Sequence, residues 1–179
     1  LYPQYCGATT ATVVDKAGDC LRTMRWQPAL RSLPPYHDDP LHITALAADL
    51  GTQLDGLAFQ PEVLILSFHG MPARTLELGD PYHCQCRKTA RLLEVALARP
   101  GLRIATTFQS RFGKARWLEP ATDAVLAAEA SRGTRRLAIA APGVVGGGYL
   151  GFDPQRAEYS GMLQLELADR IALKAMGLL

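Results

Sequence analysis

Three short apolar runs along the chain predict the strands of a parallel sheet. The clearest run covers residues 63–68, and two more follow at 103–108 and 136–141. Segments with helical spacing separate the runs, which is the pattern of βαβ units. The sequence therefore predicts the α/β class, with a parallel sheet flanked by helices. A further short strand is predicted at residues 29–33.

Apolar positions at helical spacing predict the helices between and around these runs. The segments are residues 9–24, 84–98, 120–131 and 159–176, and another begins at Asp38-Asp39-Pro40. An acidic cap followed by proline in the first turn is typical of a helix start. That helix is expected to bury one apolar face, made by Ile43, Leu46, Ala47, Leu50, Leu54 and Leu57. Residues 70–82 and 109–119 are predicted to be loops.

The expected topology gathers polar residues at one edge of the sheet. The loops that follow parallel strands lie at the same edge when the crossovers are right-handed, and ligands of open α/β sheets bind there. His69, the segment 109–111 and the glycine-rich segment 146–148 are therefore expected around one crevice.

His69 is the most informative candidate for chemistry in that crevice. It ends a buried run and precedes a turn, in the segment Ser67-Phe68-His69-Gly70-Met71-Pro72. An imidazole can take or give a proton near neutral pH, which suits a catalytic role. A polar residue that only caps a strand is the alternative, and this segment alone does not separate the two.

Composition and charge exclude several classes of function. The net charge of the 179-residue chain is +2 at pH 7, without a long basic patch, so nothing favours nucleic acid as a partner. The start of the chain does not resemble a signal peptide, and the longest weakly polar stretch is broken by Pro142 and several glycines. We expect a cytoplasmic protein that at most rests on the surface of a membrane, peripheral to the inner membrane.

The four cysteines leave two interpretations open. Reduced structural thiols are favoured, because the residues are too few and too scattered for a disulfide framework: Cys6, Cys20, Cys84 and Cys86. A [2Fe-2S] cluster that uses all four thiolates is the alternative, since the number of ligands matches.

Several ordered segments resemble the ferrochelatases, the enzymes that insert ferrous iron into a porphyrin in haem synthesis. The resemblance covers about residues 1–143, and the motifs follow one another at the spacing of that family. The matching segments are Leu1-Tyr2-Pro3-Gln4-Tyr5, Pro35-Tyr36-His37-Asp38-Asp39-Pro40, the segment around His69, Gly79-Asp80-Pro81-Tyr82, Gln109-Ser110-Arg111-Phe112-Gly113 and Trp117-Leu118-Glu119-Pro120.

The resemblance implies a Rossmann-like chelatase fold, incomplete in this chain, with a porphyrin cleft between two lobes. Residues 1–58 would end the N-terminal lobe, residues 59–145 would form the C-terminal Rossmann-like lobe, and residues 146–179 would form an atypical glycine-rich loop and a final helix. Because the chain starts without Met, within a predicted loop, we expect a fragment that lacks the upstream half of the enzyme.

The resemblance also assigns roles to particular residues. His69 would be the catalytic residue and a ligand of ferrous iron, which is a substrate together with protoporphyrin. Apolar and aromatic walls suit the porphyrin ring, and guanidinium groups suit its propionates. Packing in the core and surface solvation are the alternatives for most of the substrate-binding candidates, which are Tyr5, Phe68, Met71, Arg74, Gln109, Ser110, Arg111 and Trp117.

The chain departs from the family pattern after Pro142. Ferrochelatases carry a catalytic glutamate and further acids there, whereas this chain has a glycine-rich segment at 143–151. Asp153 or Glu158 would replace that carboxylate only if this segment folds inward. We therefore expect impaired metal insertion, and the alternative function is a non-catalytic porphyrin- or haem-binding domain. A nucleotide-binding role for residues 143–151 is weak, because no glycine-rich fingerprint follows the first strand.

Overall fold

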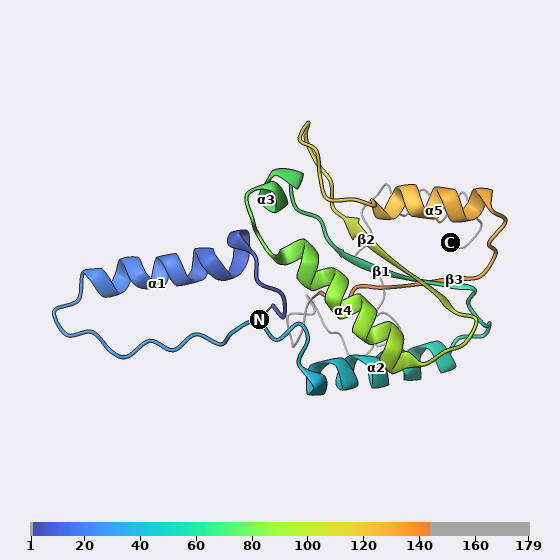
Figure 1. Ribbon diagram of the computed structural model, residues 1–179, viewed down its shortest axis with the longest axis horizontal. Coiled ribbons are helices and arrows are strands. Elements are labelled where there is room, and N and C mark those ends of the chain that lie inside the picture. The colour runs from blue at the N-terminus through green and yellow to red at the C-terminus, as the bar shows by residue number, and fades with distance from the viewer. Residues whose placement is uncertain (1, 144–179) are drawn as a thin grey trace.

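A three-stranded parallel sheet forms the centre of the computed structural model, which describes residues 2–143 (Figure 1). Strand β1 (Val63–His69) lies between β2 (Arg103–Gln109) and β3 (Leu137–Ala140), in the order β2-β1-β3. All three strands were predicted, and the parallel pairing confirms the α/β class. The predicted helix 159–176 lies outside the described residues.

Helices cover both faces of the sheet. Helices α2 (Pro40–Asp55) and α4 (Tyr82–Leu97) pack together on one face, and α5 (Thr122–Ser131) lies on the other (Figure 1). The predicted start of α2 is confirmed, since Asp39 Oδ1 accepts hydrogen bonds from the first backbone amides of the helix. The expected loop at 70–82 was wrong in part, because it contains the short helix α3 (Ala73–Glu77).

Alternate side chains of β1 supply the two halves of the core. Leu64, Leu66 and Phe68 are buried against α2 and α4, whereas Val63 and Ile65 are buried with Leu126 of α5. This follows from the period of two in a strand that is covered on both faces. Leu50 and Leu54 of α2 belong to the first of these clusters. The expected boundary between two lobes at residues 58 and 59 stays a prediction.

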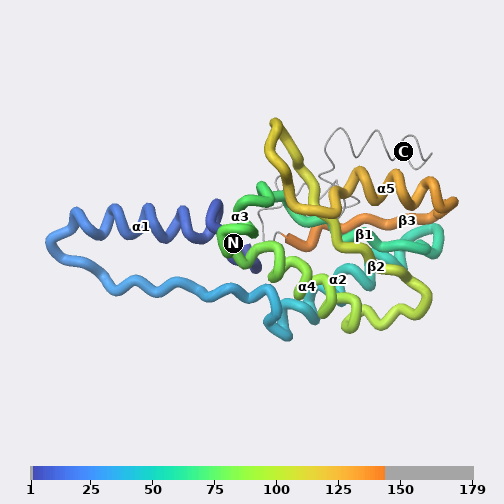
Figure 2. Tube along the Cα trace, turned by 45° about the horizontal axis from the view of Figure 1, so that its top comes forward, coloured from blue at the N-terminus to red at the C-terminus, as the bar shows by residue number. Residues whose placement is uncertain are grey.

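An arm projects from the body of the protein (Figures 1 and 2). It consists of the π-helical turn η1 (Gly7–Ala11), helix α1 (Thr12–Arg22) and an extended return segment. The predicted strand at 29–33 was wrong: within residues 2–143 this segment pairs with no strand, and its side chains are exposed. Favourable residue types do not make a strand where no neighbouring strand is present to pair with. No helix in the described part of the chain has the length and apolar character needed to cross a membrane.

Glu129 of α5 is a buried carboxylate held by three donors. Its side chain is 3% exposed and accepts hydrogen bonds from Arg103 (2.7 Å), Arg132 (2.7 Å) and Thr134 (2.7 Å). These donors, Arg103 first, favour the charged form and lower the pKa of Glu129 to about 2. The cluster ties α5 to the start of β2, at the edge of the sheet opposite to His69.

We expect Glu129→Gln to lower the free energy of unfolding by about 1–2 kcal/mol at pH 7. Because the folded pKa lies below the value of about 4.3 for an unfolded glutamate, this stabilisation is complete above pH 5 and is lost as the pH falls toward 2. Urea unfolding between pH 7 and pH 2.5 measures it, with Glu94→Gln on the exposed side of α4 as the control. A constant difference between the wild type and Glu129→Gln over this range would contradict the prediction.

Candidate active site

The end of β1 brings His69 to the carboxyl edge of the sheet. His69 is the last residue of the strand and is exposed, and it lies in register with Gln109, the last residue of β2. This register confirms the expected juxtaposition of His69 with Gln109, the first residue of the segment 109–111. The segment 146–148, expected at the same crevice, lies outside the described residues.

Gly70 allows the chain to turn sharply after His69. Its amide donates a hydrogen bond to the carbonyl oxygen of Gln109 at 2.7 Å. A Cβ atom on residue 70 would lie closer than 3.0 Å to that oxygen, and 3.3 Å from the Trp117 ring. This close approach of two backbones explains why a glycine follows the histidine.

The loop between β2 and α5 (residues 110–121) is shaped like a hairpin and forms one side of a pocket beside His69. The loop is joined to the turn after His69 by the hydrogen bonds Leu118 N to Met71 O and Ala73 N to Arg116 O, both 2.8 Å. The pocket between them has a volume of about 430 Å³. It is lined by His69, Gly70, Met71, Pro72, Phe112, Gly113, Lys114, Ala115 and Trp117.

Two aromatic rings form one wall of this pocket. Phe112 is 71% exposed, and its ring centroid lies 4.7 Å from that of Trp117, which is mostly buried. The indole Nε1 of Trp117 donates to the carbonyl oxygen of Phe112 at 2.9 Å and holds the loop in this conformation. The pocket therefore offers an apolar, aromatic surface next to an exposed imidazole.

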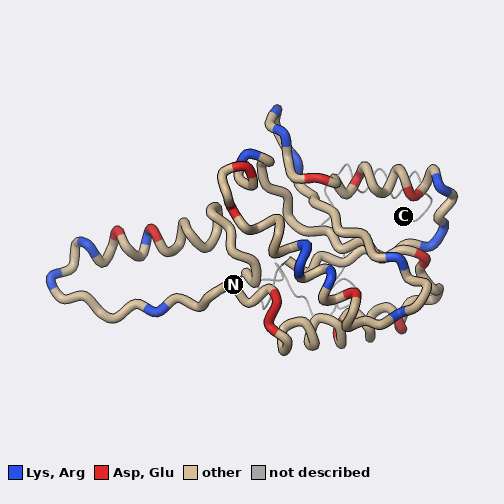
Figure 3. Tube along the Cα trace, viewed as in Figure 1, with Lys and Arg blue, Asp and Glu red and all other residues tan. Residues whose placement is uncertain are grey.

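Sequence reasoning missed Phe112 and Lys114 as candidates. Phe112 lies within the motif quoted for residues 109–113, so the motif was a signal for it, but a sequence does not show which side chains of a loop face a pocket. Positive charge is concentrated on this hairpin, at Arg111, Lys114 and Arg116 (Figure 3).

The predicted substrate-binding residues separate into different environments. Met71 and Trp117 line the pocket, whereas Phe68 is fully buried in the core and has no surface to offer a ligand. Its position in β1 explains the difference, because residues 64, 66 and 68 face α2 and α4. Tyr5 is half-buried outside the pocket lining, where its amide donates to Gln85 Oε1 at 2.6 Å.

The remaining candidates lie around the rim or beyond the pocket. Arg111 forms an ion pair with Asp123 at the start of α5, so its charge is already partnered. Arg74 is exposed on α3 and does not line the pocket, and Ser110 turns the chain out of β2 with a φ of 71°. Glu158 lies outside the described residues.

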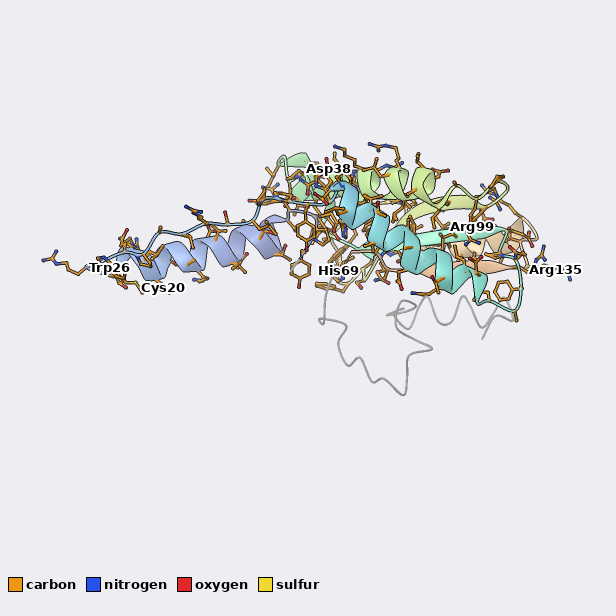
Figure 4. All side chains as sticks on the ribbon, turned by 90° about the horizontal axis from the view of Figure 1, so that it is seen from below. Cys20, Trp26, Asp38, His69, Arg99 and Arg135 are labelled. Atoms are coloured by element: carbon orange, nitrogen blue, oxygen red, sulfur yellow. The ribbon has the colours of Figure 1, made fainter. Side chains whose placement is uncertain are left out.

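The cysteines of the described segment do not converge. Cys20 lies near the tip of the arm, far from His69 (Figure 4), while Cys84 and Cys86 are on α4. Between residues 2 and 143, no group of three or more His, Cys, Asp or Glu side chains is arranged to hold a metal ion. Burial raises the thiol pKa of Cys6 and Cys86, which favours the protonated thiol at neutral pH.

Comparison with known proteins adds the family to this geometry. The family model described as Ferrochelatase matches residues 1–146. The chain is 55% identical over 145 residues to a ferrochelatase of Rhizobium meliloti, 53% identical to one of Agrobacterium fabrum, and 49% identical over 143 residues to one of Methylocella silvestris. The matches cover 81%, 81% and 80% of this chain, but only 43%, 42% and 41% of the relatives. The chain therefore belongs to the ferrochelatase family and spans about two fifths of the length of these relatives.

Proposed function

We propose that this chain binds protoporphyrin beside His69 and takes part in the insertion of ferrous iron into it, the reaction that yields haem. The observation that carries the proposal is an exposed imidazole at the mouth of an apolar, aromatic pocket, at the carboxyl edge of the sheet of a ferrochelatase-family chain. Because the matched segment spans only about two fifths of the relatives' length, the activity and both substrates are part of this proposal.

The chemistry requires a group that accepts protons beside the ring. Protoporphyrin takes up Fe²⁺ only when two pyrrole N–H protons leave, so that haem and two protons are formed. A neutral imidazole accepts such a proton or ligates the entering metal, and His69 is the group that we assign to this step. Among residues 2–143, no hydrogen bond engages the imidazole nitrogens of His69. This supports their availability to accept a proton or to ligate the metal.

The walls of the pocket suit the other parts of a porphyrin. The rings of Phe112 and Trp117, with the thioether of Met71, offer apolar contact to a flat macrocycle. Lys114 adds a cation to the lining, which suits a propionate at the edge of the ring. A location in the cytoplasm and contact with a membrane surface stay predictions.

A second candidate function, porphyrin binding without metal insertion, is favoured by the composition of the pocket. Its lining contains one cation and one imidazole but no carboxylate among the described residues. A carboxylate opposite His69 would attract Fe²⁺ or accept the second proton. Without such a group, the porphyrin would bind but would not gain its metal.

Titration of the chain with protoporphyrin, followed by an anaerobic assay with Fe²⁺, tests both functions. The chain has two tryptophans: Trp117 lines the pocket and Trp26 lies at the far end of the arm (Figure 4). We expect porphyrin to quench the fluorescence of a Trp26→Phe variant, which retains Trp117, much more than that of Trp117→Phe. Binding with haem formation supports the first function, and binding without haem supports the second. Failure to bind would contradict both.

A further inference from the structure

Helix α4 holds the end of β1 at the residue that carries the proposed chemistry. The Tyr82 hydroxyl, in the first turn of α4, donates a hydrogen bond to the backbone carbonyl of His69 at 3.0 Å. Strand β3 pairs with β1 only as far as Leu66. The Tyr82 hydroxyl therefore contacts β1 at His69, which lies beyond the last residue that pairs with β3. At this residue β1 is paired with β2.

The carbonyl of His69 and the amide of Gly70 belong to one peptide group, and both of its polar atoms are engaged. Tyr82 donates to the oxygen, and the Gly70 nitrogen donates to Gln109 O at 2.7 Å. Two hydrogen bonds in different directions restrict rotation of this peptide about its neighbouring bonds. Because this peptide includes the carbonyl carbon of His69, holding it fixes one of the three backbone atoms that define the Cα–Cβ bond along which the imidazole leaves the strand.

We infer that Tyr82 is a positioning residue for His69, an inference that rests on the proposed function of His69. Its phenol fixes the peptide that follows the histidine, and so keeps the imidazole in place at the mouth of the pocket. A shift of about 1 Å in a reacting group costs on the order of 100-fold in rate. A single hydrogen bond at this peptide therefore affects turnover more than it affects the fold.

Tyr82 is itself held in a fixed position. Its amide donates to Asp80 Oδ1 at 2.9 Å, and Asp80 Oδ2 accepts from the amide of Gly7 at 2.7 Å. The ring packs against the core cluster that contains Leu66 and Phe68. Burial raises the pKa of the phenol far above its usual range, so the hydroxyl stays a donor at every pH at which the protein is folded.

Tyr82→Phe tests the inference, because it removes only the hydroxyl group. We expect the ¹H–¹³C signal of the His69 imidazole to shift and broaden, with the assignment taken from its loss in His69→Gln. We also expect kcat for metal insertion to fall about tenfold, while KM for porphyrin changes less than about threefold. Tyr36→Phe is the matched control, since it removes a phenol oxygen on the segment before α2, from a ring that packs against His42.

A second variant guards against a general loss of structure. In Asp80→Asn the carboxylate becomes a carboxamide with a single acceptor oxygen, which cannot accept from both Tyr82 N and Gly7 N, and we expect it to shift the His69 signal in the same direction by a smaller amount. An unchanged His69 signal in both Tyr82→Phe and Asp80→Asn would overturn the inference. If His69→Ala leaves metal insertion intact, the proposed function fails, whereas the spectra still decide whether Tyr82 positions His69.

Discussion

Iron insertion is expected to fall at least 100-fold when His69 is replaced by alanine, while the affinity for protoporphyrin stays within about threefold. A positioned general base or ligand contributes on the order of 10²–10⁴-fold to a rate. His69 lies at the exposed end of β1, and its side chain contributes only part of the pocket surface. The apolar contacts with Phe112 and Trp117 remain in the variant, so binding is preserved and the chemical step is lost.

Two measurements separate this loss from unfolding. Quenching of Trp117 fluorescence by porphyrin reports binding, and formation of haem from Fe²⁺ under anaerobic conditions reports turnover. His42→Asn on α2 is the control, because it removes an imidazole whose ring packs against Tyr36 rather than at the pocket. Turnover in His69→Ala at the level of the wild type would remove His69 from the mechanism.

The position of His69 could be predicted because it depends on topology alone. The run 63–68 is apolar on both faces, so the strand had to be central, and the residue after it had to emerge at the edge of the sheet. The pairing of His69 with Gln109 follows from two parallel strands that end together. Neither conclusion requires knowledge of any side-chain conformation.

The walls of the pocket could not be predicted in the same way. Phe68 precedes His69 in the sequence and Phe112 belongs to the motif 109–113, but Phe68 is fully buried whereas Phe112 is 71% exposed. The alternation within β1 decides the first, whereas the second depends on hydrogen bonds that shape the hairpin, such as Trp117 Nε1 to Phe112 O. These contacts join residues that have no periodic relation in the sequence.

The segment 29–33 was predicted to be a strand, and this prediction failed for a different reason. Its residues favour a strand, but a strand needs a neighbour, and the described part of the chain offers none beside it. The short helix α3 escaped prediction because five residues are too few to display a helical period. Both errors concern segments whose conformation depends on their surroundings rather than on their own pattern.

Gly70→Ala is expected to damage both stability and function. The new Cβ atom would lie closer than 3.0 Å to the carbonyl oxygen of Gln109, which belongs to the backbone of β2 and has little freedom to move. To relieve this contact, the backbone at Gly70 must move away from the end of β2, which breaks the hydrogen bond from Gly70 N to Gln109 O. Overpacking of this kind costs about 1–3 kcal/mol, and the lost hydrogen bond adds about 1 kcal/mol.

The same displacement moves His69 relative to the pocket, so function is expected to suffer more than the fold. A free energy of unfolding lower by about 2–4 kcal/mol still leaves a folded protein in many domains of this size, but misplacement of the imidazole by about 1 Å lowers turnover on the order of 100-fold. Urea unfolding and the haem assay measure the two effects separately. Gly18→Ala in α1 is the control: no atom lies within 4 Å of its added Cβ, and alanine in a helix is expected to stabilise by about 0.5–1 kcal/mol. Wild-type stability and turnover in Gly70→Ala would mean that the backbones of β1 and β2 can part at this edge at no cost, and the rigid placement of His69 would then have to come from elsewhere.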